Sequence, residues 1–184
     1  MRNGWFFEKT VVLSGKENAM IKFELNTYIY RPLKQVFAFV VTPENDFHWQ
    51  YGTLMSTKIS EGEMGVGTLF RAVGHFMGQR MESVYEVTEF EPNKRYGFKS
   101  LSGQMDSYTL YTFEIMEGST RFNISAQISL GEPFKSNLTT TERTLKKEYR
   151  ENLALLKEAL EASPVDRRSE SPFVVSNRRK SDLR

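Results

Sequence analysis

The sequence of 184 residues contains no cysteine and only two histidines. Without cysteine the chain has no disulfide framework, no thiolate metal site, no cysteine-ligated iron–sulfur cluster and no thiol nucleophile. His48 and His75 alone make none of the conventional metal-ligand patterns, which need further ligands at helical or turn spacing. We therefore expect no metal and no other cofactor. The lack of disulfides also favours a cytoplasmic protein.

Long apolar runs are missing as well. No segment approaches the ~18 consecutive apolar residues that a membrane-spanning helix needs. The first residues, MRNGWFFEKTVVLSG, include Glu8 and Lys9, which keep the apolar run shorter than the ~7–15 residues of a signal-peptide core. We expect neither a membrane span nor secretion.

The positive charge is concentrated at one end of the chain. The net charge is +2, but residues 20–162 hold 16 basic and 18 acidic residues, whereas residues 163–184 hold six basic and three acidic ones. A nearly neutral body argues against nucleic acid as a partner, because neutralising phosphates needs a concentrated basic surface. Residues 163–184, rich in Ser, Pro and Arg, are predicted to be a disordered, solubilising basic tail in preference to a segment that binds anionic membranes or nucleic acid.

The patterns divide the rest of the chain into an extension and one folded domain. Residues 1–19 show no periodicity and are predicted to be a poorly ordered extension; the alternative is an extra edge strand over Thr10–Leu13. The domain, residues 20–162, begins with a strand over Ile21–Ile29, in which apolar and polar residues alternate. A short helix follows Pro32, with an apolar face made by Val36, Phe37, Phe39 and Val40.

Six further strand-like segments occupy residues 55–130, and short turns between them predict an antiparallel meander. Beyond them the period lengthens, and the apolar positions of an amphipathic helix of about six turns are Leu145, Tyr149, Leu153, Leu156 and Leu160. The predicted class is α+β: a curved antiparallel sheet of about six to seven strands wrapped around a long C-terminal helix.

Several motifs sit at fixed places in this order. Residues 32–49 read P-x-x-x-V-F-x-F-V-x-x-P-E-N-x-x-x-W, and Gly65–Thr68, Glu86–Pro92 and Asn152–Glu161 follow downstream. On these residues the chain, over roughly 20–162, resembles the START/Bet v 1-like (SRPBCC) superfamily with its helix-grip fold, and within it the polyketide cyclase/dehydrase and lipid-transport branch. The resemblance implies a deep pocket between the inner face of the sheet and the long helix. It specifies no reaction, because binders, carriers, cyclases and co-chaperones share this fold.

Strand alternation and the helical period predict which side chains face that pocket. The candidate ligand-binding residues on these patterns are Phe70, Met81, Tyr85, Phe98, Tyr111, Phe113 and Tyr149, and Trp49, in the loop under the short helix, is added to them. A set of apolar rings with a few hydroxyl groups is typical of small-molecule cavities. The same side chains could instead fill a core at ordinary packing density, and Trp49 could act as a plug between the short helix and the sheet.

No catalytic residue is assigned. His48, beside Trp49, remains a candidate general base at the pocket mouth, and His75 is interpreted as a surface or rim residue. The acidic residues of one strand are expected on a solvated outer face: Glu82, Glu86, Glu89 and Glu91.

The leading hypothesis is a non-catalytic protein, monomer or homodimer, that binds or carries a hydrophobic small molecule of lipid-like, polyketide-like or aromatic type. The alternatives are a cyclase or dehydratase that uses the same cavity, and a co-chaperone-like interaction module.

Overall fold

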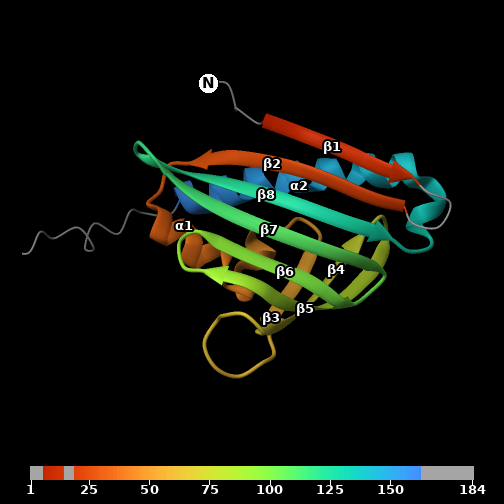
Figure 1. Ribbon diagram of the computed structural model, residues 1–184, viewed down its shortest axis with the longest axis horizontal. Helices are drawn as coiled ribbons and strands as arrows, with labels where there is room; N and C mark the ends of the chain where they lie inside the picture. Colours follow the sequence, from red (N-terminus) through yellow and green to blue (C-terminus); the bar gives the residue numbers. More distant parts are fainter. Residues whose placement is uncertain (1–5, 15–18, 163–184) are drawn as a thin grey trace, which may run out of the picture.

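The computed structural model describes residues 6–14 and 19–162. Eight antiparallel strands form one curved sheet, in the order β1-β2-β8-β7-β6-β5-β4-β3 (Figure 1). The strands are β1 Phe6–Ser14, β2 Ala19–Ile29, β3 Thr53–Lys58, β4 Leu69–Phe76, β5 Gln79–Glu91, β6 Arg95–Ser102, β7 Met105–Met116 and β8 Ser119–Leu130. The helices are α1 Leu33–Val40 and α2 Leu138–Ala162, with short 3-10 helices η1 Pro43–His48 and η2 Phe134–Asn137.

Strands β3 to β8 form the predicted meander. The β4–β5 connection is a two-residue turn at Met77 and Gly78, with φ of 49° and 77°. Positive φ at both positions gives the turn a twist that matches the strands it joins. Strand β2 then pairs with β8 over all but its first residue, from Met20 opposite Ser129 to Ile29 opposite Thr120.

The helix α2 lies against the concave face of the sheet, behind strands β2 and β8 in Figure 1. Residues of β8 alternate strictly between buried and half-buried, as the sequence predicts. The helix buries four of its predicted apolar positions, Leu145, Leu153, Leu156 and Leu160. The predicted helix-grip architecture is therefore confirmed, with strands β2–β8 as its seven-stranded core.

The eighth strand corrects the expectation for residues 6–14 of the predicted extension, whereas residues 1–5 and 15–18 lie outside the described residues. Where a poorly ordered extension is predicted, Phe6–Ser14 forms β1 and pairs antiparallel with β2. The less favoured alternative, a strand over Thr10–Leu13, falls within it. An edge strand exposes unpaired N–H and C=O groups, and these can pair with any adjacent segment of sufficient β-propensity, even one without alternation.

The segment α1–η1–Trp49 closes one end of the sheet. Phe37 of α1 packs against Phe113 of β7, with ring centroids 5.1 Å apart. Trp49 is only 1% exposed and lies 6.1 Å from the ring of Tyr111 and 6.4 Å from that of Phe122. Trp49 is thus a plug between the helical segment and the sheet.

Within residues 6–14 and 19–162, no helix is long and apolar enough to cross a membrane. The predicted basic tail, residues 163–184, lies outside the described residues.

Candidate ligand cavity

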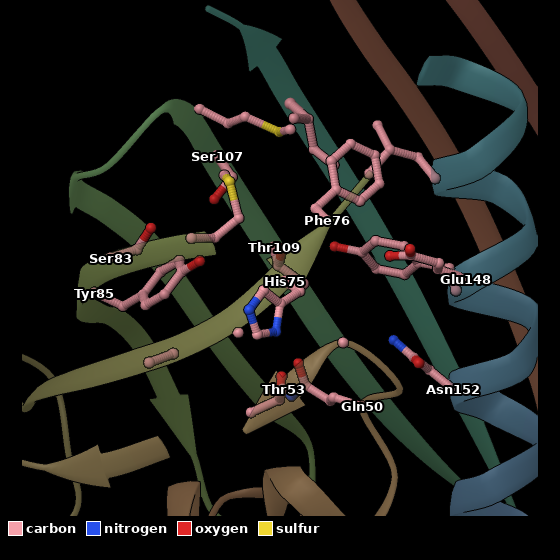
Figure 2. Close-up of a pocket in the computed structure, with 18 of the residues that line it drawn as sticks. Gln50, Thr53, His75, Phe76, Ser83, Tyr85, Ser107, Thr109, Glu148 and Asn152 are labelled. Atoms are coloured by element: carbon pink, nitrogen blue, oxygen red, sulfur yellow. The ribbon is translucent and has the colours of Figure 1, made fainter. Parts of the chain in front are cut away.

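A cavity of about 200 Å³, here called the main chamber, lies between α2 and the inner face of the sheet. Its walls come from β4 to β8, from the segment 49–53 that follows η1, and from α2. In Figure 2, Tyr85 reaches into it from the sheet, whereas Glu148 and Asn152 approach from the helix.

A second cavity of about 80 Å³, here called the inner chamber, adjoins the first and reaches toward η1. The two share Gln50, Thr53, Ala72, Tyr85, Phe98 and Tyr111 as walls. Beyond these shared residues the inner chamber is lined by Asp46, Tyr96, Phe70 and Val40. A ligand can therefore place a small group in the inner chamber while its larger part stays in the main one.

Asp46 is the unexpected residue of the inner chamber. It lies in η1, is 7% exposed, and borders the aromatic walls. Burial raises the pKa of Asp46 from 3.8 to about 7, since a desolvated carboxylate is unfavourable; the side chains of Ser56 and Gln50 oppose the shift. Near neutral pH this carboxyl group is therefore ready to take up or release a proton.

Glu148 on α2 is a second carboxyl group, at the wall of the main chamber. Partial burial raises its pKa to about 7, and the negative charge of Glu151 adds to the effect, while Lys147 opposes it. The two carboxyl groups line different chambers and come from different elements: Glu148 belongs to α2 and lines the main chamber, and Asp46 belongs to η1 and lines the inner chamber.

Three tyrosines add hydroxyl groups to the walls: Tyr85, Tyr111 and Tyr149. Burial raises the pKa of all three above its usual value, to about 12 for Tyr149. They stay protonated at neutral pH and can donate as well as accept hydrogen bonds.

Segment 49–53, the end of β4 and α2 meet beside His75, the exposed residue of the lining, and we call this place the mouth of the main chamber. Gly52 and Gly74 let segment 49–53 and the end of β4 come close together, because a Cβ on Gly74 would lie 2.4 Å from the carbonyl oxygen of Gly52. The amide of His75 donates a hydrogen bond of 2.8 Å to that same oxygen. Both glycines are therefore required by backbone contact at the mouth.

The family assignment follows from the sequence match over this fold. Residues 20–161 match the family described as polyketide cyclase / dehydrase and lipid transport. The chain belongs to this family. No curated protein sequence matches it.

Solved structures share the fold. The protein TTHA0849 from Thermus thermophilus has a TM-score of 0.67 at 19% identity, covering 77% of this chain and 97% of that one. The ZhuI aromatase/cyclase from Streptomyces sp. R1128 has a TM-score of 0.66 at 11% identity, covering 77% and 94%. A START superfamily protein from Mycobacterium smegmatis has a TM-score of 0.67 at 10% identity, covering 77% and 97%. At these identities the likeness shows the fold alone.

Six of the eight candidate residues of this family member line the main chamber: Trp49, Met81, Tyr85, Phe98, Tyr111 and Tyr149. Phe70 lines only the inner chamber, where its ring stacks on that of Tyr85 at 5.1 Å. That any of them contacts a ligand stays a prediction.

Phe113 lines neither chamber, so the prediction that its side chain faces the pocket is wrong. It follows Tyr111 on the same face of β7, but at that level the sheet is covered by α1 instead of α2. Its ring packs between Phe37 and Phe122, at 5.1 Å from each. Alternation identifies the face of a strand but not which helix covers it.

The structure supports the prediction for His75 but not the candidate role of His48. His48 is exposed, its ring lies 3.8 Å from that of Phe47 in a tilted arrangement, and it is not among the residues that line the chambers, so the geometry does not support it as a general base there. His75 is exposed and lines the mouth, which confirms its interpretation as a rim residue.

The acidic residues of β5 form ion pairs with neighbouring strands on the outer face: Glu82 with Arg71, Glu86 with Lys99 and Glu89 with Arg95. The prediction of a solvated outer face holds for these three. Among the described residues no three His, Asp or Glu side chains gather in a way that could hold a metal ion.

The sequence interpretation missed Asp46, Glu148 and Asn152. For the helix a signal was present, because 145, 148, 149 and 152 follow the i, i+3, i+4, i+7 spacing of one helix face. Asp46 carries no such signal, since the six residues of the 3-10 helix η1 show no periodicity from which its direction could be predicted.

Proposed function

We propose that the protein binds and carries a small, largely apolar molecule in the main chamber. The observation that supports this most strongly is the chamber itself, about 200 Å³ of space inside a core that is otherwise closely packed with aromatic rings. Natural cores are filled to high density and contain few voids larger than a water molecule, so a space of this size between sheet and helix favours a ligand-binding role.

The chemistry of the walls agrees with this role. Aromatic and aliphatic side chains supply apolar area, and a few hydroxyl and amide groups supply orientation. The indole Nε1 of Trp49 is buried and has no hydrogen-bond partner among the described residues. A buried donor without a partner is unfavourable, so a polar atom of a bound molecule would stabilise it.

The size of the chamber restricts the ligand. Drug-sized ligands occupy pockets of about 300–1,000 Å³, whereas the main chamber measures about 200 Å³. We therefore expect a compact molecule of one or two rings, or a short chain, in preference to a two-chain lipid.

Native mass spectrometry of gently purified protein tests the proposal directly. We expect a reproducible mass excess over the denatured chain, and fragmentation of that species identifies the ligand class. The Phe98→Trp variant, which places a larger ring at the wall that both chambers share, should reduce or lose the excess, whereas Leu101→Trp, on an exposed position of the same strand, should keep it. A mass excess that survives in Phe98→Trp would place the ligand elsewhere and contradict the proposal.

A second candidate is a cyclase or dehydratase in the same cavity. Its support is the pair of carboxyl groups, Asp46 and Glu148, each with a pKa of about 7, which suits a group that exchanges protons near neutral pH. For an enzyme, Glu148→Gln should abolish conversion of a bound polyketide-like substrate while leaving its binding intact. Equal loss of binding and of conversion would favour simple carriage.

A further inference from the structure

The charges that line the two chambers are all of one sign apart from a residue at the mouth. Asp46 and Glu148 are the ionisable acids of the walls, and no lysine or arginine is found among the described residues that line either chamber. Among the described residues, His75 is the single basic side chain that lines either chamber, and it is exposed at the mouth of the main chamber. A ligand carboxylate or phosphate would thus meet two acids and no fixed cation.

The inner chamber surrounds one carboxyl group with aromatic rings. Asp46 is buried there, and the walls include Tyr85, Tyr96, Phe98 and Tyr111. The Phe98 ring lies 5.3 Å from that of Tyr96 and 5.4 Å from that of Tyr111, so the rings form one continuous wall. Faces of aromatic rings attract cations, and the attraction grows when the cation is removed from water.

We propose that the carried molecule is a small organic amine, with its protonated nitrogen in the inner chamber beside the Asp46 carboxylate and its apolar body in the main chamber. This inference rests on the proposed function and specifies the ligand class of the same cavity. At about 80 Å³ the inner chamber accommodates an ammonium or methylammonium group but not a ring system with substituents.

The charges around Asp46 also favour a cationic ligand group. Glu44, two residues away on η1, adds negative charge, and the other neighbours that act on Asp46 are the neutral side chains of Ser56 and Gln50. Burial without a cation raises the pKa of Asp46 to about 7. An ammonium group at this position would remove the cause of the shift, because it stabilises the charged form of the carboxyl group.

Three probes with one ring and one linker but different end groups test the proposal: 2-phenylethylamine, 2-phenylethanol and 3-phenylpropionate. Binding at pH 7.5 is followed by NMR on the full-length protein through the indole N–H of Trp49, which lies in the wall of the main chamber. Replacing Trp5 by Phe assigns the signal, because these are the only two tryptophans. We expect the amine to bind about 10-fold or more tightly than the alcohol, and the carboxylate to bind least.

Two variants locate the preference. In Asp46→Asn the amine should lose its advantage over the alcohol, while the affinity for the alcohol changes less than about twofold. Asn has nearly the same shape and no charge, so the fold is retained, which thermal unfolding verifies. In the control Glu82→Gln, an acid on the outer face paired with Arg71, the amine preference should persist.

The outcomes separate the two proposals. If the alcohol or the carboxylate binds as tightly as the amine, the cavity binds ligands but the amine proposal is wrong. If the amine preference survives in Asp46→Asn, its assignment to the inner chamber is wrong. If none of the probes shifts the Trp49 signal, the cavity does not accept molecules of this size, and carriage and amine recognition are both rejected.

Discussion

The amide nitrogen of Tyr51 donates a hydrogen bond of 2.7 Å to Oδ1 of Asn152. This bond joins the segment after Trp49 to the middle of α2, across the mouth of the main chamber. On its other side the same segment is held by the 2.8 Å hydrogen bond from the His75 amide to the Gly52 carbonyl oxygen. The mouth is therefore held from the helix by one side chain and from the sheet by backbone contact, and only the first can be removed without disturbing the sheet.

Replacing Asn152 by Ala should loosen the mouth. The Tyr51 amide loses its acceptor, so we expect faster hydrogen exchange at Tyr51, faster entry and exit of a bound probe, and a loss of about 1 kcal/mol in the free energy of unfolding. Asn152→Asp keeps an acceptor oxygen and should keep slow exchange. Unchanged exchange at Tyr51 in the Ala variant would show that the bond does not hold the mouth.

The end of α2 is fixed by Glu161. Its Oε1 accepts hydrogen bonds from the Tyr30 amide at 2.8 Å and from Lys157 Nζ at 2.6 Å, and Arg31 donates to its carbonyl oxygen. We expect Glu161→Ala to lower the free energy of unfolding by about 1–2 kcal/mol in urea titrations, because the Tyr30 amide and Lys157 each lose an acceptor. Glu158→Ala, an exposed position one turn earlier, should change it by less than about 0.5 kcal/mol. Equal effects of the two changes would contradict this role.

The sequence was sufficient for the architecture because the strands and α2 bury one regular face each. Strand β8 alternates over its full length, and α2 repeats Leu145, Leu153, Leu156 and Leu160, so period and length together predict both elements. The same regularity placed five of the seven candidate residues predicted from it in the main chamber. It failed for Phe113, where the covering element changes from α2 to α1 along one strand.

Other features depend on contacts that have no local pattern. Strand β1 forms because the edge of β2 is available for pairing, and that edge is a property of the assembled sheet. The mouth depends on Gly52 and Gly74 meeting across 22 residues of sequence, and a lone glycine in a strand does not reveal its partner. The position of Asp46 depends on the path of η1 beneath the sheet, so its burial was not predictable from composition or spacing.

Asp46 should make stability depend on pH. Its pKa is about 7 in the folded protein and near 3.8 in the unfolded chain, so the unfolded state binds fewer protons between these values and the free energy of unfolding falls as pH rises from about 4 to about 7. The full stabilisation is present below pH 4 and is lost above pH 7. Relative to Asp46→Asn, wild type should lose on the order of a few kcal/mol across this window.

The comparison with Asp46→Asn isolates this residue, since Glu148, whose pKa is also raised, contributes in the same direction to both proteins. Urea unfolding at several pH values between 4 and 8 provides the measurement. Parallel pH profiles for wild type and Asp46→Asn would mean that the carboxyl group is not desolvated in the folded protein.

Filling the chamber should separate binding from folding. Phe98 lines both chambers and is only partly buried, so the larger indole of Phe98→Trp can extend into free space instead of into packed neighbours. We expect binding of a neutral hydrophobic probe such as 2-phenylethanol to weaken about 10-fold, the equivalent of ~1.4 kcal/mol, with thermal stability retained or slightly increased. Leu101→Trp adds an indole at an exposed position of the same strand and should leave probe affinity unchanged. If both variants fold and bind the probe as wild type does, the space beside Phe98 is not where the ligand lies, and the binding site must be sought outside these two chambers.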